Sequence, residues 1–471
     1  MPVGSVLIAI FLRDAATESR GRLAGLDSGV GEALDLLRPI KTAIADLQPE
    51  FASASRSQPL ETGPKRARMA SGLWTSITTA DAVDTPDPQP SPTTTETPPD
   101  EVETRIRSKI LQTLKFDDIG ARESQIQTPF PDTFKWLLED QPPDKGTGDA
   151  ISPPPTKFKE WLESQANEDP FWVTGIPASG KSTLMKFTAT NPNVRQHLEA
   201  WSGEVPLLMC SVYFWNLGSS SQKSQTGLLS TILYQLLSQR PDLCRHATLT
   251  RYRSFQLAGP DAPHPPPWTL EELRSGLSRF VSGIHGTGRL ALFVDGLDEY
   301  DGDLDTLISF LKRLYSDHKV KLCVSSRPWN AFKDAFRTYP SLRMEHFTKP
   351  DITKYVRTRI GASPAFQELQ GPFATDVERL EAQIIEKANG VFLWVVLVVQ
   401  KIIGTARDNN DLGEIWKVFG GLSPGLEELY ASMRERLDPA HRETASKMYQ
   451  LLFRWNETFD HQFEVSVSGP P

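Results

Sequence analysis

The sequence is poor in cysteine, has no long apolar run and carries no excess of positive charge. Its 471 residues include only three cysteines, Cys210, Cys244 and Cys323, which lie far apart and form no Cys-x-x-Cys pair. A zinc site and a disulfide framework are therefore not indicated, and a reducing, cytoplasmic setting is expected. The apolar stretch Val391 to Ile403 is too short to cross a bilayer and predicts a buried helix. A formal net charge of -8 argues against a protein that coats nucleic acid.

A phosphate-binding motif is present in the context that it requires. The apolar run Phe171–Thr174 predicts a buried strand, Gly175-x-x-x-x-Gly180-Lys181-Ser182 follows it, and a helix-prone stretch comes next. In such a P-loop, successive backbone N–H groups and the positive end of the helix form a cradle for phosphate oxygens. The flanking strand and helix argue against the alternative, a chance glycine turn. The predicted nucleotide-binding residues are Gly175, Ile176, Pro177, Ala178, Ser179, Gly180, Lys181, Ser182 and Thr183.

Two of these residues have more specific expected roles. The Lys181 ammonium is expected to contact the β- and γ-phosphates, and the Ser182 hydroxyl is expected to ligate Mg²⁺.

An acidic cluster is the candidate for the other half of the site. Residues 290–294 are apolar and predict a strand buried on both faces of a parallel sheet. Asp295 comes at the carboxyl end of this strand, where ligands bind in such sheets, and is predicted to hold Mg²⁺ directly or through water. Asp298 or Glu299 would orient the attacking water. The alternative is that these acids form the solvated cap of the next helix.

A third motif follows another short strand, predicted at 320–326. Pro328 cannot continue a strand ladder, so the strand is expected to end just before it. Arg327 would then lie at the tip of the strand, where its guanidinium could reach the γ-phosphate and report its presence. A surface arginine without a role is the alternative.

These motifs together resemble the NACHT class of STAND-type P-loop NTPases, and more closely fungal NLR-like proteins of the heterokaryon-incompatibility type, whose P-loop module is nephrocystin-like. The resemblance covers about residues 105–455. It includes a second strand and helix at Cys210–Trp215 and Gly227–Leu237, a helical segment at Glu386–Val395 and a further helix at Leu422–Tyr430. One departure is Ala178, at a position where such proteins often carry glycine. If that position needs a positive φ, alanine costs about 1 kcal/mol there.

The expected fold is α/β: a P-loop NTPase with a parallel sheet flanked by helices, between a helical N-terminal segment and an α-helical C-terminal region. Leucine and isoleucine at helical spacing between residues 21 and 50 indicate an amphipathic helix, and Ser, Thr and Pro dominate from 53 to 100. Apolar residues between Phe134 and Leu138 indicate one further helix ahead of the P-loop. The predicted segments are a helical segment at 1–52, which is either a working or a degenerate effector-type domain, a disordered linker at 53–101, helices at 102–165, the NTPase at 166–345 and a helical, incipient winged-helix-like region at 346–471.

The resemblance implies a signalling switch that binds ATP, or GTP, with Mg²⁺ and hydrolyses it slowly, in fungal non-self recognition. It also implies self-association or an effector partner, and neither a nucleic-acid partner nor a membrane span is expected. A pseudo-NTPase scaffold and a small-molecule kinase are the alternatives, although no second substrate pocket is evident. Internal repeats are absent. Since related proteins usually carry a repeat sensor after the NTPase, the chain is expected to be either an effector-plus-switch fragment or the product of a truncated gene model.

Overall fold

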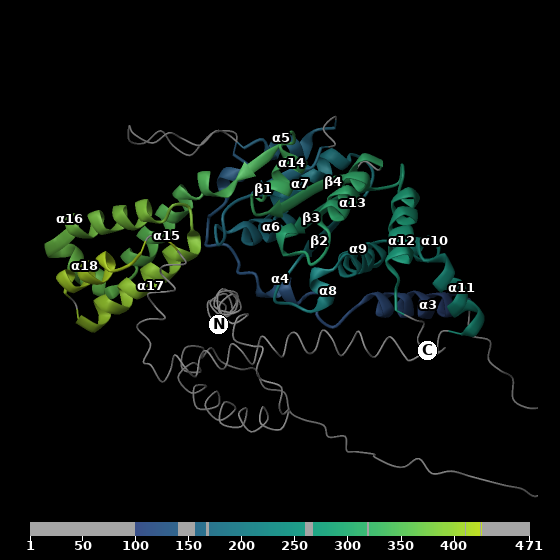
Figure 1. Ribbon diagram of the computed structural model, residues 1–471, viewed down its shortest axis with the longest axis horizontal. Helices are drawn as coiled ribbons and strands as arrows, with labels where there is room; N and C mark the ends of the chain where they lie inside the picture. Colours follow the sequence, from purple (N-terminus) through teal and green to yellow (C-terminus); the bar gives the residue numbers. More distant parts are fainter. Residues whose placement is uncertain are drawn as a thin grey trace, which may run out of the picture. The chain divides into compact units, whose positions relative to one another are not determined.

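The computed structural model describes residues 99–139, 156–165, 169–259, 267–317, 320–409, 411–423 and 425. At their centre lies a sheet of five parallel strands in the order β2-β3-β4-β1-β5 (Figure 1). The strands are β1 (Phe171–Thr174), β2 (Leu207–Tyr213), β3 (Arg289–Asp295), β4 (Val320–Ser326) and β5 (Ser341–Arg343). This arrangement confirms the predicted α/β class with a parallel sheet flanked by helices.

Each face of the sheet has its own apolar core, because successive side chains of a strand point to opposite faces. In β3, Leu290, Leu292 and Val294 join one core, whereas Ala291 and Phe293 join the other. The first core includes side chains of helices α3 (Pro99–Leu114), α9 (Gln225–Gln239), α12 (Leu270–Gly283), α13 (Leu304–Asp317) and α14 (Asn330–Phe336). The second includes side chains of α5 (Phe158–Glu163), α6 (Lys181–Thr190) and α7 (Pro192–Ser202). Burial on both faces is the reason that the central strands are almost continuously apolar.

Shorter elements connect these layers. They are α4 (Ala121–Gln125), η2 (Lys135–Leu137), α8 (Ser220–Lys223), η3 (Pro241–Leu243), α10 (Cys244–Ala247), α11 (Leu249–Ala258), η4 (Leu297–Glu299) and η5 (Met344–His346).

A separate apolar core belongs to the C-terminal helices, coloured yellow-green in Figure 1. They are α15 (Lys349–Gly361), α16 (Pro364–Lys387), α17 (Phe392–Asn409) and α18 (Leu412–Gly420). Trp394 and Val395 of α17 are fully buried, which confirms the buried helix predicted from the apolar stretch that begins at Val391. Phe373 has a non-helical backbone directly after Pro372 and kinks α16, as expected where proline lacks an N–H.

The helix predicted near Phe134 is wrong in its extent. Only the single turn η2 forms there, because Asp132 and Phe134 adopt the left-handed conformation with φ of 61° and 62°. The Asp351 carboxylate in α15 accepts the Phe134 backbone N–H at 3.1 Å and the Trp136 indole N–H at 2.8 Å. A side chain more than 200 residues away in sequence thus holds this turn.

The stretch Glu386–Val395, expected as one helical segment, is two helices joined by a corner at residues 388–391. Asn389 and Gly390 have φ of 46° and 79° and end α16, and α17 begins at Phe392. A Cβ on Gly390 would lie 2.6 Å from the Cβ of Glu345, so only glycine fits this close approach.

Several predictions fall outside the described residues. They concern the helical segment 1–52, most of the linker 53–101 and nearly all of the helix expected at Leu422–Tyr430. Helix α3 begins at Pro99, so its first turn lies within the stretch assigned to the linker. Among the described helices, none combines the length and apolar character that a bilayer crossing demands.

Candidate nucleotide-binding site

The P-loop connects β1, at the centre of the sheet, to helix α6. Gly180 precedes the helix with φ of 99°, and Ala178 has φ of 59°. The Lys181 ammonium donates to the carbonyl oxygens of Gly175 at 2.8 Å and Ile176 at 3.0 Å, so it lies over the loop. A Cβ on Gly175 would lie 2.9 Å from each of three neighbouring atoms, which explains why this position is glycine.

The positive φ at Ala178 shows that this position of the P-loop does adopt the left-handed conformation, at which glycine was expected. A non-glycine residue in the left-handed conformation costs about 1–2 kcal/mol. The loop therefore pays a conformational penalty at the one position where the sequence departs from the expected glycine.

Asp295 is brought next to the P-loop, because β3 and β1 both flank β4. Asp295 is only 2% exposed, its carboxylate accepts a hydrogen bond from the Ser325 hydroxyl, and the Ser182 hydroxyl lies close enough to lower its pKa. Ser325 in turn accepts the Gly296 backbone N–H at 3.0 Å. Burial raises the pKa of Asp295, whereas the two hydroxyl donors and the nearby Lys181 lower it. Burial also lowers the pKa of Lys181, while Asp298 and Asp295 raise it.

Asp298 and Arg327, predicted as separate functional residues, form an ion pair in which the carboxylate is buried and the guanidinium is partly exposed. The Arg327 Nε donates to Asp298 Oδ2 at 2.9 Å, and the Arg327 backbone N–H donates to Oδ1 at 2.9 Å. The Asp298 side chain is only 4% exposed. Both of its oxygens are thus engaged by the segment that follows β4.

Glu299 lies on the other side of Asp295, toward β2. Its Oε2 accepts the Asn216 backbone N–H at 2.9 Å. Burial raises the pKa of Glu299, and the positive charge of Arg122 opposes that rise. Arg122 belongs to α4 and also lowers the pKa of Asp295, so it faces the acidic cluster from outside the NTPase motifs.

Sequence reasoning missed Arg122 and Glu345, which contacts the P-loop as described below. Both lie far from the motifs in sequence, and no spacing signal marks them.

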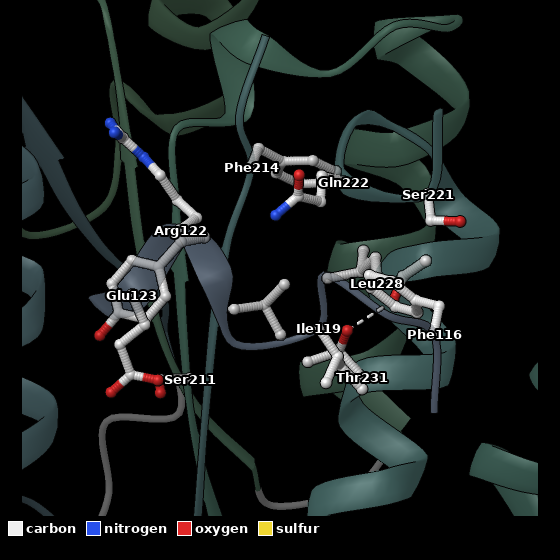
Figure 2. Close-up of a pocket in the computed structure, with 13 residues that line it drawn as sticks. Phe116, Ile119, Arg122, Glu123, Ser211, Phe214, Ser221, Gln222, Leu228 and Thr231 are labelled. Carbon is white, nitrogen blue, oxygen red and sulfur yellow. Dashed lines mark hydrogen bonds between the residues drawn. The ribbon is translucent and has the colours of Figure 1, made fainter. Parts of the chain in front are cut away.

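Helix α4 also borders a small cavity beside β2, shown in Figure 2. Its apolar lining includes Phe116, Phe214 and Leu228, and Arg122 and Glu123 lie at its edge. Helix α4 is tied to the P-loop helix because the Lys186 ammonium of α6 donates to the carbonyls of Glu123 and Ile126 at 2.7 and 2.9 Å. This segment therefore lies against the helix that begins at the phosphate cradle. The full lining is Phe116, Ile119, Arg122, Glu123, Ser211, Val212, Tyr213, Phe214, Ser221, Gln222, Gly227, Leu228 and Thr231.

The residues at this edge fit a magnesium nucleotide. The Ser182 hydroxyl and Asp295 carboxylate are hard oxygen donors, which suit a cation that takes one or two protein ligands and completes its shell with phosphate and water. No group of three His, Cys, Asp or Glu side chains suited to a dedicated metal cage occurs in the described ranges. Within the same ranges the Ser179 hydroxyl is buried and makes no hydrogen bond, so a donor in the loop is left over for a ligand.

A parallel sheet with a P-loop after β1 and a buried acid ending β3 defines the class of P-loop NTPases. Comparison with known proteins narrows this class to a family of sequences and a curated relative. Residues 146–327 match the family described as nephrocystin 3, N-terminal. The chain is 25% identical over 370 residues to the vegetative incompatibility protein HET-E-1 of Podospora anserina, a match over 74% of this chain and 24% of that relative.

These two matches confirm the resemblance to fungal NACHT proteins of the heterokaryon-incompatibility type. The chain spans about a quarter of the length of the relative, so the activity of that whole protein does not transfer directly.

Proposed function

We propose that the protein is a nucleotide-dependent switch that binds ATP with Mg²⁺ and hydrolyses it slowly. One observation carries the proposal: β1 and β3 flank the same strand, so Ser182 at the start of α6 lies beside the buried carboxylate of Asp295 at the end of β3, where its hydroxyl lowers the pKa of that carboxyl. Two motifs more than 100 residues apart thus meet where a metal-bound triphosphate would be held.

The residues divide the work as follows. The amides of the P-loop and the Lys181 ammonium would bind the phosphates, and Ser182 and Asp295 would hold Mg²⁺. A bound Mg²⁺ supplies positive charge that offsets the charge developing on the transferred phosphoryl group. Glu299 or Asp298 would orient the attacking water, and Arg327 would contact the γ-phosphate. Catalysis of this kind depends on positioning and charge rather than on a covalent intermediate.

The Asp298–Arg327 ion pair favours a second candidate, a protein that binds nucleotide without turnover. Each Asp298 oxygen already accepts an N–H of Arg327 and the Asp298 side chain is only 4% exposed, so little of the carboxylate faces water, and Arg327 is turned toward Asp298. Slow hydrolysis would need this pair to open. Phosphate release measured beside nucleotide binding separates the two candidates, since a scaffold binds and does not release phosphate.

The biological role is proposed from the relative, whose printed name is a vegetative incompatibility protein. We infer a signalling function of that kind, with self-association or an effector as the partner, in the cytoplasm. The three described cysteines are free and buried, which accords with a reducing compartment. We propose that α4 covers the base side of the nucleotide, because it lies against α6. ATP and GTP both remain candidates.

The first test is binding of ATP·Mg²⁺ to the whole chain and to Lys181→Ala. Loss of a charged hydrogen-bond donor costs about 1.5–3 kcal/mol, so the dissociation constant should rise about ten- to a hundredfold. Lys401→Ala removes an exposed lysine from α17 and should leave binding unchanged. If the wild type binds ATP no better than Lys181→Ala, the proposed function is wrong.

A further inference from the structure

We infer that Glu345 is an internal competitor for the phosphate cradle, and that its displacement by nucleotide loosens the corner at 388–391 between α16 and α17. The inference rests on the proposed function, because it needs a phosphate that competes. Glu345 belongs to η5, in the segment that connects the last strand of the sheet to the C-terminal helices.

The Glu345 carboxylate lies directly over the first residues of the P-loop. Its Oε2 accepts the Ile176 backbone N–H at 3.4 Å, and the same oxygen lies 2.9 Å from the position of a Cβ on Gly175. Amides of this loop are the groups that bind phosphate oxygens in a P-loop. A carboxylate of the protein itself thus uses part of an anion-binding site.

An ion pair holds this carboxylate over the loop. Arg343 Nε donates to its Oε1 at 2.6 Å, and the side chain is only 12% exposed. Its charge acts on Lys181, since it is among the groups that raise the pKa of that lysine. Two anions close together in a buried site repel strongly, so a triphosphate in the loop and Glu345 in its present position disfavour one another.

The backbone of Glu345 also packs directly against the 388–391 corner. A Cβ on Gly390 would lie 2.6 Å from the Cβ of Glu345 and 2.8 Å from its Cα, so the two backbones pack with no room between them. The Thr348 hydroxyl donates to the Gly390 carbonyl at 3.4 Å. Just beyond, the Leu393 N–H at the start of α17 donates to the carbonyl of Ala178 in the P-loop at 3.4 Å.

The contacts form one continuous path. The P-loop meets Glu345, Glu345 meets Gly390, and α17 returns to the P-loop at Ala178. Movement of Glu345 away from the loop therefore changes its packing against Gly390 in the 388–391 corner. Nucleotide binding would be weakened by the cost of moving Glu345, and the same cost would couple the phosphate site to the C-terminal helices.

The experiment compares ATP·Mg²⁺ binding to the wild type and to Glu345→Gln, which removes the charge and keeps the side-chain shape. Glu345→Gln should bind ATP about tenfold or more tightly, because a like charge leaves the site. Glu199→Gln is the matched control: it removes the carboxylate from another Arg–Glu pair that joins Nε to Oε1, Arg195 to Glu199 at 2.9 Å, on the surface of α7. Its affinity should equal that of the wild type.

A second measurement follows hydrogen exchange of the backbone amides at 388–396 with and without ATP·Mg²⁺. In the wild type, ATP should speed their exchange. In Glu345→Gln the exchange should already be fast without ATP and should change less when ATP is added. Glu345→Asp, which keeps the charge but shortens the side chain, should lie between the two and serves if Glu345→Gln does not fold.

The outcomes separate the two ideas. Tighter binding by Glu345→Gln together with a nucleotide-dependent change at 388–396 supports the inference. Equal binding by both proteins, or an unchanged exchange rate at 388–396 in the wild type, overturns the inference and leaves nucleotide binding intact. If neither protein binds ATP, the proposed function is wrong, and so is the inference that Glu345 competes with phosphate.

Discussion

Ala178 has a left-handed backbone in the P-loop, although its Cβ disfavours that conformation. Glycine relieves a penalty of about 1–2 kcal/mol there but gives back part of it, because it loses about 0.5–1 kcal/mol more on folding. Ala178→Gly should therefore raise the free energy of unfolding by about 0.5–1 kcal/mol, as measured by urea denaturation. Ala335→Gly in α14 is the control, where glycine should instead destabilise the protein by about 1 kcal/mol. A loss of stability in Ala178→Gly would contradict the strain assigned to the loop.

Site residues that lie within a sequence motif could be predicted from the sequence. Residues that lie outside the motifs and contact the site only in the folded protein could not. Lys181 and Ser182 follow one buried strand and Asp295 ends another, so the pattern of apolar residues located their positions before the fold was known. The structure also pairs Asp298 with Arg327, which no spacing predicts, because the contact depends on how β3 and β4 align. Glu345 reaches the P-loop only because β5 pairs with β1 at the edge of the sheet.

At the scale of elements, the turn around η2 depends on one buried carboxylate in α15. Burial raises the pKa of Asp351 to about 6, while the Trp136 and Phe134 donors and Lys354 lower it and Glu139 raises it. The folded protein therefore holds this proton more tightly than the unfolded chain. The contribution of Asp351 to the free energy of unfolding should fall as the pH rises from about 4 to about 6 and stay constant above that range.

Asp351→Asn tests this pH dependence, because asparagine keeps an oxygen for the two N–H donors and does not ionise. The free energy of unfolding of the variant, relative to the wild type, should rise by about 1–3 kcal/mol between pH 4 and pH 7. Urea denaturation at several pH values measures the difference. Asp334→Asn, at an exposed position in α14, is the matched control for the loss of one carboxylate. A flat difference for Asp351→Asn would show that its pKa is not raised.

Elements with a local cause were the ones that the sequence predicted well. The strands are short apolar runs, such as β1, which ends at Thr174 directly before the P-loop glycine. The turn at η2 and the 388–391 corner were missed, because the former needs Asp351 and the latter needs close packing against Glu345. Their causes are tertiary contacts, which helical periodicity does not report.

At the scale of the whole molecule, the candidate site joins segments that are far apart in the chain. The P-loop, the acids after β3 and Arg327 after β4 meet at the carboxyl ends of three strands, and Glu345 adds the segment that leads to the C-terminal helices. A ligand that contacts all of these segments binds the folded protein and not the unfolded chain. Binding must therefore stabilise the fold by mass action.

ATP·Mg²⁺ at about a hundred times its dissociation constant should raise the free energy of unfolding by about 2.7 kcal/mol. Chelation of the metal with EDTA should remove most of that gain, because Ser182 and Asp295 would hold Mg²⁺ and the Asp295 carboxylate would repel the phosphates without its charge. Calorimetric unfolding with ATP, with ATP and EDTA, and without ligand measures the three states. Lys181→Ala should show little gain in any of them. An equal gain in that variant would mean that ATP binds somewhere other than the P-loop, and the arrangement around Asp295 would then have no bearing on nucleotide.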